Sequence, residues 1–304
     1  MTSRTARRWA IAVAGLWAVC SVVTKLPAED DAAATTRPPG VGNDPQATQV
    51  ADLAKQFTGR CEFTLESEPQ RRLTLHPHPI LRFSNPTVGQ VFGDTYLWTD
   101  RGRPAVVASY YKFFSPDWGR NLEVSSLAEG RISARMDQVR FWTPAESGVT
   151  FQPLADAEPP APSPAARLVQ MRRLAAGFKA LLADTRNEGN VVTRQLRQLT
   201  QPVYRYPPAD ADATYLDGAM FAFVEGTDPE VLLLLEAVPV GNVARWRFGL
   251  ARTNGGALRV TFRDRPIWSV PHLDSSLDRV QEPYTLFSLE HPLKESRPSP
   301  ANGE

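Results

Sequence analysis

Four arginines that alternate with apolar residues form the clearest chemical pattern in the chain. In two segments, Arg245 to Leu250 and Arg259 to Arg263, basic and large apolar side chains follow one another in a period of two. If these segments are paired strands, one face is apolar and the other carries four guanidinium groups, which match carboxylate and phosphate geometry. The pattern predicts a surface for an anionic ligand, formed by Arg245, Arg247, Arg259 and Arg263. The alternative is an exposed sheet face whose charges are screened or paired with acids.

The histidines and paired acids are weaker candidates. His76 and His78 flank a proline and would lie on one side of an extended segment, but no third metal ligand stands beside them. We therefore expect a surface connection there and no metal site. Asp210 and Asp212 lie among proline and alanine, which is typical of a solvated loop.

A second acidic group and one cysteine are also interpreted as structural. Asp274, Asp278 and Glu282 follow a four-residue spacing near His272 and are interpreted as surface carboxylates. Cys61 has no base that the sequence can place beside it, so we expect a buried, inert thiol. Four tryptophans could stack on sugars but are more typical of core residues at strand ends: Trp98, Trp118, Trp142 and Trp268.

Motifs of the common enzyme classes are absent from the sequence. It contains no zinc-protease histidine pair, P-loop, dinucleotide glycine triad, nucleophile elbow or cysteine-pair metal motif. We expect no cofactor, and the balance favours a protein that is not an enzyme. The alternative is a hydrolase whose dispersed Asp, Glu and His side chains meet only in the fold.

Composition limits the architecture and the partners. The 304 residues include 27 prolines, nearly double the usual ~5%, which disfavours a helical bundle. The 34 basic and 33 acidic side chains leave a net charge of +1, which disfavours a nucleic-acid binder. A small anionic or cell-envelope ligand is the expected partner class, and the sequence does not identify a protein partner.

The N-terminal residues have the order of an export signal. Arg4, Arg7 and Arg8 precede an uncharged apolar run over 9–23, which is shorter than the ~20 residues of a membrane-spanning helix. We expect a signal peptide over 1–28, with export by the general or the twin-arginine route to the periplasm, envelope or exterior. No stable membrane span is expected after cleavage; an uncleaved signal anchor is the alternative. Residues 29–45 are expected to be a disordered tether and 293–304 a disordered tail.

Between these ends, two β-rich segments share one pattern of strands and turns. The first, over 93–144, has arms at 95–99, 104–114, 121–128 and 132–141; the second, over 218–271, has arms at 218–224, 231–238, 246–251 and 258–262. Turn spacing, the proline after each first turn, and Trp142 and Trp268 correspond at a shift near 125 residues. This suggests a duplicated unit, and the alternative is that any two antiparallel meanders look alike.

A linker and a helix are predicted over 154–186, between these segments. Ser163 is a candidate N-cap and Pro164 occupies the first helical position. The opposite face is basic and could instead contact a membrane or a partner. Apolar residues at helical spacing predict one buried face that covers a sheet: Leu168, Met171, Ala175, Phe178 and Leu182. A shorter helix is predicted from Asp44–Pro45 to Gly59.

Two segments carry a resemblance. Leu97 to Pro104 and Gly226 to Ala237 resemble an uncharacterised group of exported bacterial proteins, over roughly 75–271. The resemblance implies an exported location and no site residues. The predicted fold is α+β and predominantly antiparallel: two related four-stranded meanders packed together in one domain over 46–292, as a sandwich or open barrel with one covering helix. The expected function is a non-enzymatic binding or structural role in the periplasm or cell envelope.

Overall fold

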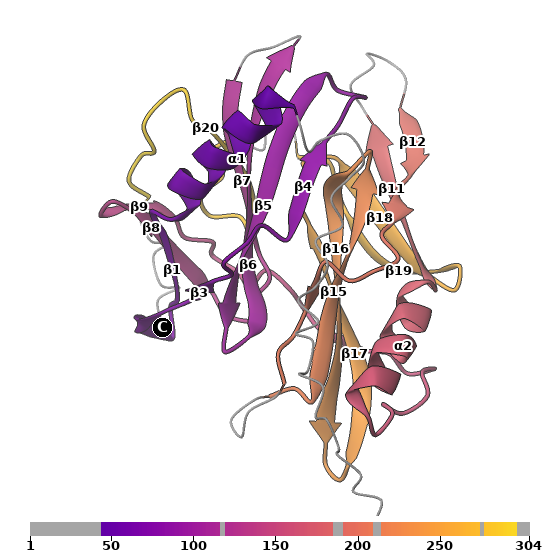
Figure 1. Cartoon of the computed structure of the whole chain (residues 1–304). Helices are drawn as coiled ribbons and strands as arrows, with labels where there is room; N and C mark the ends of the chain where they lie inside the picture. The colour runs from indigo at the N-terminus through magenta and orange to yellow at the C-terminus, as the bar shows by residue number, and fades with distance from the viewer. Residues whose placement is uncertain (1–43, 116–118, 185–190, 209–213, 274–276, 297–304) are drawn as a thin grey trace, which may run out of the picture. The chain divides into compact units, whose positions relative to one another are not determined.

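The computed structural model describes residues 44–115, 119–184, 191–208, 214–273 and 277–296 (Figure 1). It is mostly antiparallel β, with 52% strand and 11% helix in four sheets of four to six strands. The predicted α+β class is therefore confirmed, and none of these sheets closes into a barrel. In this part of the chain no helix has the length and apolar character needed to cross a bilayer.

The first half of the described chain begins with α1 (Pro45–Thr58) and continues with nine strands. They are β1 (Cys61–Leu65), β2 (Glu68–Arg72), β3 (Thr74–Leu75), β4 (Leu81–Ser84), β5 (Gln90–Asp100), β6 (Arg103–Ser115), β7 (Gly119–Ser126), β8 (Ile132–Met136) and β9 (Val139–Trp142). They form a four-stranded sheet of order β2-β1-β8-β9 and a six-stranded sheet in which β20 (Tyr284–Ser288) joins β7-β6-β5-β3, with β4 also on β5.

The second half has the same succession. β10 (Gln152–Pro153) and α2 (Pro164–Ala175) are followed by β11 (Phe178–Asp184), β12 (Val192–Gln195), β13 (Arg197–Gln198), β14 (Tyr204–Arg205), β15 (Asp217–Glu225), β16 (Asp228–Val240), β17 (Val243–Arg252), β18 (Ala257–Phe262) and β19 (Arg265–Val270). The sheets are β12-β11-β18-β19 and β10-β17-β16-β15-β13, with β14 also on β15. Strand for strand, the pairing order matches that of the first half.

Three apolar clusters hold these layers together. One lies between the two sheets of the first half and includes Phe63, Trp98 and Trp142; a second lies between the two sheets of the second half. The third joins the halves through the remaining faces of the six-stranded sheets, with Leu97 and Val107 from one half and Leu232 from the other. Because both faces of the central strands are covered, β15 is buried along its whole length and β16 along most of it.

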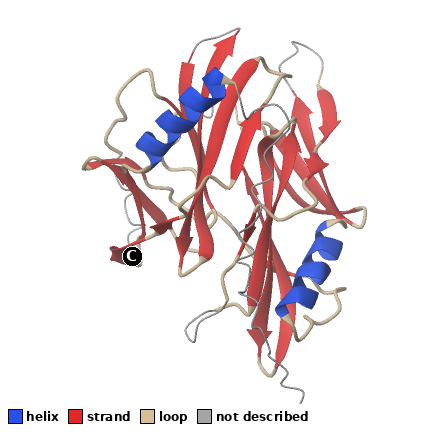
Figure 2. Ribbon diagram, in the orientation of Figure 1, coloured by secondary structure: helices blue, strands red, loops and turns tan. Residues whose placement is uncertain are grey.

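Each helix packs on its own half and begins with a capping residue (Figure 2). Asp44 Oδ1 accepts a hydrogen bond from the Gln46 amide at 2.8 Å, and Ser163 Oγ accepts one from Ala166 at 3.3 Å, with proline next in both cases. The predicted start of the second helix is confirmed. Its predicted end is wrong: the helix stops at Ala175, and Phe178–Asp184 is strand β11, paired with β18.

The fourth arm of each predicted meander does not pair with the third. After β7 the chain passes to the other sheet, where β8 pairs with β1 and β9; after β17 it does the same to form β18. The free edges of β7 and β17 are occupied by β20 and β10. The arm predicted over 132–141 is two strands joined at Asp137 and Gln138, which both have positive φ, as two-residue hairpin turns require.

The hairpin turn of each half packs on the other half. The β5–β6 turn has φ of 49° at Arg101 and 81° at Gly102, and the Gly102 carbonyl accepts a hydrogen bond from Tyr204 at 2.9 Å. In return, the Thr227 hydroxyl of the β15–β16 turn donates to the Ser84 carbonyl at 2.9 Å. These two hydrogen bonds each connect the turn of one half to a polar group of the other half.

The C-terminal segment is ordered further than the sequence predicts. Residues 293–296 were expected to belong to the disordered tail, but the Ser296 amide donates to the Arg140 carbonyl at 2.6 Å and Leu293 packs on the core of the first half. The predicted signal peptide and most of the predicted tether, 1–43, lie outside the described residues, as does 297–304.

Candidate functional site

Two polar clusters lie where the halves meet. The first, called here the ion-pair cluster, consists of Arg103, Glu129, Glu236 and Arg247. Glu236, fully buried in β16, accepts two hydrogen bonds from Arg103, at 2.7 and 3.1 Å, and one from Arg247 Nε at 2.8 Å. Glu129 bridges the outer nitrogens of the same arginines at 2.8 and 3.3 Å. The cluster has two cations and two anions, and it is satisfied within itself.

An aromatic ring completes the ion-pair cluster. The guanidinium carbons of Arg103 and Arg247 lie 4.7 and 4.3 Å from the centre of the Phe151 ring, which is cation–π distance. Burial lowers the pKa of Arg103, but the charge and hydrogen bond of Glu236 outweigh it and raise the pKa above its ordinary value. The Arg103 guanidinium group is therefore held permanently charged.

The second cluster, called here the acidic pocket, surrounds a cavity of about 400 Å³. Its polar lining includes four carboxyl side chains, contributed by β7, β15 and β16, and two tyrosines from β6 and β20: Glu123, Glu225, Asp228, Glu230, Tyr111 and Tyr284. Phe113 and His272 also line it. Among the described residues, no lysine or arginine is part of its lining.

The strands explain how these side chains converge. Glu123 is on β7 of the first half, whereas Asp228 opens β16 of the second half, directly after the turn that packs near Ser84. Asn85 follows and approaches Asp228 Oδ2 at 3.5 Å. The docking of that turn therefore places a carboxyl group of one half near a carboxyl group of the other.

Hydrogen bonds orient Glu123. Its Oε1 accepts from Tyr284 at 2.9 Å and from Tyr111 at 3.3 Å. Within the described chain, Glu123 Oε2 has no hydrogen-bond or ion-pair partner, and the contact with Asn85 is the one side-chain bond of Asp228. Two carboxyl groups thus retain acceptor oxygens at the cavity.

The same two carboxyl groups are poor acids in this setting. Burial raises the pKa of Glu123 to about 7, although the two phenol hydrogen bonds lower it. Burial, followed by the charge of Glu123, raises the pKa of Asp228 well above its usual range. Burial and mutual repulsion therefore favour the protonated form of both groups.

Two arginines near the acidic pocket already have partners, and one of these partners, Glu225, lines the pocket itself. Arg194 pairs with Glu225 at 2.5 Å. Arg252 donates to the carbonyls of Asn254, Gly256 and Pro271 at 2.6–3.1 Å, which supports the crossing from β17 to β18. In the described part of the chain, no group of three or more Asp, Glu, His or Cys side chains has the arrangement needed to hold a metal ion.

The predicted arginine surface does not form. Arg245 and Arg247 are on β17, but Arg259 and Arg263 belong to β18 and the turn after it, in a different sheet. The prediction assumed that these strands pair, and β17 pairs instead with β16 and β10. Arg247 is part of the ion-pair cluster, while the other three are exposed.

The remaining sequence candidates have structural places. His76 Nδ1 contacts the His78 carbonyl at 2.8 Å, and its ring packs on Tyr204. Cys61 is buried, as predicted, and burial raises the pKa of its thiol to about 12. Trp98 and Trp142 are core residues, whereas Trp268 is partly buried at the edge of the core.

The predictions for the paired acids and for Trp118 are only partly covered by the described residues. Asp210, Asp212, Asp274 and Trp118 lie outside them. Asp278 and Glu282 are not on a helix: Asp278 has a φ of 52°, and its amide bonds to Leu286 next to β20. His272, predicted beside these acids, is instead at the acidic pocket.

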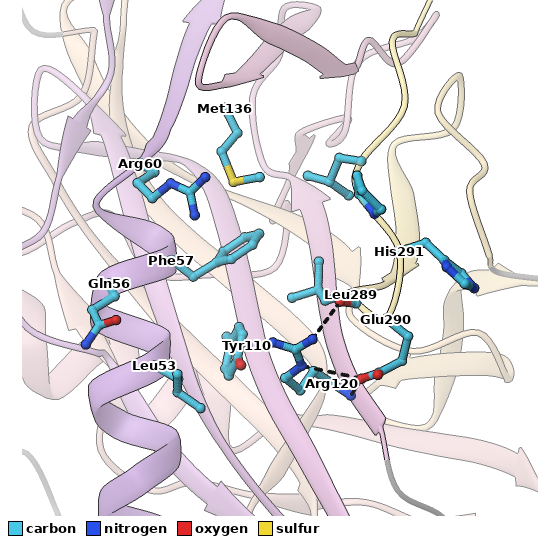
Figure 3. Close-up of a pocket in the computed structure, with 12 residues that line it drawn as sticks. Leu53, Gln56, Phe57, Arg60, Tyr110, Arg120, Met136, Leu289, Glu290 and His291 are labelled. Atoms are coloured by element: carbon cyan, nitrogen blue, oxygen red, sulfur yellow. Dashed lines mark hydrogen bonds and ion pairs between the residues drawn. The ribbon is translucent and has the colours of Figure 1, made fainter.

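A second cavity, of about 440 Å³, lies between α1 and the segment after β20 (Figure 3). Phe57 and Leu289 supply part of its apolar lining, and Arg120 donates from Nη2 to the Leu289 carbonyl at 3.1 Å. Its two arginines are already paired, Arg60 with Asp137 and Arg120 with Glu290. It is a less specific site than the acidic pocket, whose carboxyl groups retain acceptor oxygens.

No family model, curated protein or solved structure compared with this chain matches it. The site must therefore be interpreted from its own geometry.

Proposed function

We propose that this protein is an exported ligand-binding protein whose acidic pocket holds a small organic cation. The observation that carries the proposal is a cavity of about 400 Å³ with four carboxyl residues and, within the described chain, no basic residue in its lining. A cavity of this size is within the range of small-molecule sites. Because the lining of this cavity is acidic, the proposed ligand is a cation and not the anion that the sequence suggested.

Electrostatics supports a cationic ligand. Carboxyl groups crowded in a poorly solvated cavity repel one another when ionised, and they respond by holding protons. A bound cation supplies a counter-charge to Glu123 and Asp228, so ligand binding and proton release are coupled. Tyr111, Phe113 and Tyr284 add aromatic surface of the kind that attracts organic cations.

Export and duplication are part of the same proposal and rest on the sequence. The basic and apolar N-terminus and the resemblance to exported bacterial proteins support a location in the periplasm, envelope or exterior. The shift near 125 residues, together with the matching strand orders, supports descent of both halves from one duplicated unit.

A hydrolase is the second candidate. The convergence of Glu123, Asp228 and His272 at one cavity favours it, because a carboxyl group with a pKa near 7 is suited to general acid–base catalysis. A binding role stays ahead because the sequence contains none of the common hydrolase motifs.

Calorimetric titration of the full chain tests the proposal. At pH 8 we expect 1,4-diaminobutane to bind and the uncharged 1,4-butanediol not to bind. Glu123→Gln and Asp228→Asn should each weaken binding at least tenfold, whereas Glu129→Gln, in the ion-pair cluster, should not. Equal binding of the diamine by all four proteins, or by none, would overturn the proposal.

A further inference from the structure

A cavity of about 220 Å³ lies at the end of α2 and shares no lining residue with the acidic pocket. Its lining, called here the α2 cavity, includes the rings of Trp246 on β17 and Phe262 on β18, with Leu174 of α2. Trp246 is only 2% exposed, and its buried indole N–H has no hydrogen-bond acceptor among the described residues. A buried donor without an acceptor is rare and costly in a folded protein, which favours a partner from outside the chain.

Hydrogen bonds fix the walls of the α2 cavity to one another. The Arg263 amide, in the turn after β18, donates to the Gly177 carbonyl after α2 at 2.8 Å. Gln170 of α2 donates to the Pro159 carbonyl at 3.0 Å and accepts from the Ala161 amide at 2.7 Å. The helix is therefore joined both to the turn after β18 and to the segment that precedes it.

The charged side chains of the α2 cavity have both signs. Arg173 of α2 and Arg263 supply two cations, and the segment before α2 supplies two anions, Asp156 and Glu158. Asp156 pairs with Arg265 at 3.7 Å. Among the described residues, Arg173 and Arg263 have no acidic partner. Glu158 likewise has no basic partner in this part of the chain. In contrast to the ion-pair cluster, these charges are not satisfied within the chain.

From this arrangement we infer that the α2 cavity binds a small aromatic amino acid as a zwitterion. Guanidinium groups match a carboxylate through paired hydrogen bonds, so Arg263, with Arg173, binds the ligand carboxylate. Glu158 binds the ammonium group. The ligand ring packs against Trp246 and Phe262, and a carboxylate oxygen accepts from the indole N–H. The volume limits the ligand to a small molecule. This site goes beyond the proposed function and does not depend on it.

Three ligands with one phenylpropyl skeleton test the two ligand charges. The full chain is titrated by calorimetry at pH 7 with L-phenylalanine, with 3-phenylpropionate, which lacks the ammonium group, and with 3-phenyl-1-propanol, which lacks both charges. We expect phenylalanine to bind at least tenfold more tightly than 3-phenylpropionate, and the alcohol not to bind. No binding of phenylalanine, or equal binding of phenylalanine and 3-phenylpropionate, would overturn the inference.

Variants of exposed residues show where phenylalanine binds. We expect Arg263→Gln and Glu158→Gln each to weaken its binding at least tenfold, whereas the control Arg259→Gln, an exposed arginine of β18 outside the cavity lining, should bind as the wild type does. Trp246→Phe keeps an aromatic wall but removes the N–H donor, and it should weaken binding at least threefold. Wild-type binding by Arg263→Gln would place phenylalanine outside the α2 cavity and overturn the inference, whether or not Trp246→Phe folds.

Discussion

Glu236 shows what a buried carboxylate requires in this fold. It lies in an otherwise apolar run of β16 and has no exposure to solvent, yet it receives hydrogen bonds from Arg103, Arg247 and the Tyr206 hydroxyl, the last at 2.9 Å. Two arginines from different halves thus converge on one carboxylate. The pair is costly to break, because the arginines would remain partly buried without their counter-ion.

Comparison of Glu236→Gln with Glu129→Gln measures this cost. Both substitutions remove a negative charge from the same two arginines, but the Glu129 side chain is 44% exposed and the Glu236 side chain is 0% exposed. We expect Glu236→Gln to lower the free energy of unfolding by roughly 3 kcal/mol and Glu129→Gln by less than about 1 kcal/mol. Urea unfolding at pH 7 provides the measurement, and equal losses would contradict the assigned roles.

Glu123 makes stability depend on pH in an unusual direction. Its carboxyl pKa is raised from 4.5 to about 7, so the folded state binds more protons than the unfolded state between those values. The contribution of Glu123 to stability is therefore present below about pH 4.5 and is lost as pH rises to about 7. The facing hydroxyls of Tyr284 and Tyr111 lower the pKa of Glu123, and the charge of Glu123 in turn raises the pKa of Asp228.

The variant Glu123→Gln should remove that pH dependence. Relative to the wild type, we expect it to gain on the order of 3 kcal/mol of unfolding free energy between pH 4.5 and pH 7.5, since each pKa unit corresponds to about 1.4 kcal/mol. Urea unfolding of both proteins across this range isolates Glu123 from the other titrating groups. Parallel curves for the two proteins would show that Glu123 titrates as an exposed carboxylate does.

The site residues could not be assembled from sequence. Glu123 and Asp228 are more than a hundred positions apart and meet only because one hairpin turn packs on the other half. One local feature does distinguish two of the pocket's acids: Glu123 and Glu230 lie within β-rich segments, where a charge needs a special environment. The arginine pattern is visible in the sequence, but its spacing does not show that Arg247 has partners in Glu129 and Glu236.

At the scale of elements, the hairpin turns connect sequence to the joining of the halves. Gly102 is at φ 81°, and an added Cβ would lie 2.3 Å from the Pro207 side chain of the other half. Gly241, in the β16–β17 turn, has φ 60° but no atom within 4 Å of such a Cβ. Replacement of Gly102 is therefore disfavoured both by its positive φ and by its contact with Pro207, whereas replacement of Gly241 is disfavoured by its positive φ alone.

Gly102→Ala and Gly241→Ala form a matched pair. We expect Gly241→Ala to cost about 1 kcal/mol, from the positive φ, and Gly102→Ala to cost at least about 2 kcal/mol, because the contact with Pro207 must also shift. Thermal unfolding of both variants measures the difference. Equal costs would mean that docking of the β5–β6 turn contributes little to stability.

Local sequence signals predict an element correctly where a residue type has a single physical role. Ser163 and Pro164 identified the start of α2, and alternation identified β5, β6, β15 and β16. The sequence does not reveal the end of α2, because the apolar positions at Phe178 and Leu182 fit a buried strand face as well as a helix face. The pairing of β11 with β18 is not visible in local spacing.

At the scale of the whole described chain, the spacing of the two β-rich segments predicted two related halves. What it could not predict was the crossing between sheets after β7 and β17, since that depends on β20 and β10 occupying the adjacent edges. These short strands come from segments without a strong pattern of their own. The crossing also places the four arginines in different sheets. The predicted anionic ligand depended on pairing of β17 with β18, so the wrong pairing also made the predicted arginine surface wrong.

The most direct test of the account is the pH dependence of cation binding by the acidic pocket. Calorimetric titration of the full chain with 1,4-diaminobutane is compared at pH 8 and pH 5. At pH 5 the carboxyl group of Glu123, with a pKa of about 7, holds its proton and offers no charge to the ligand. The account predicts binding at pH 8 that is at least tenfold weaker at pH 5, and it is contradicted by equal affinity at the two pH values or by no binding at pH 8.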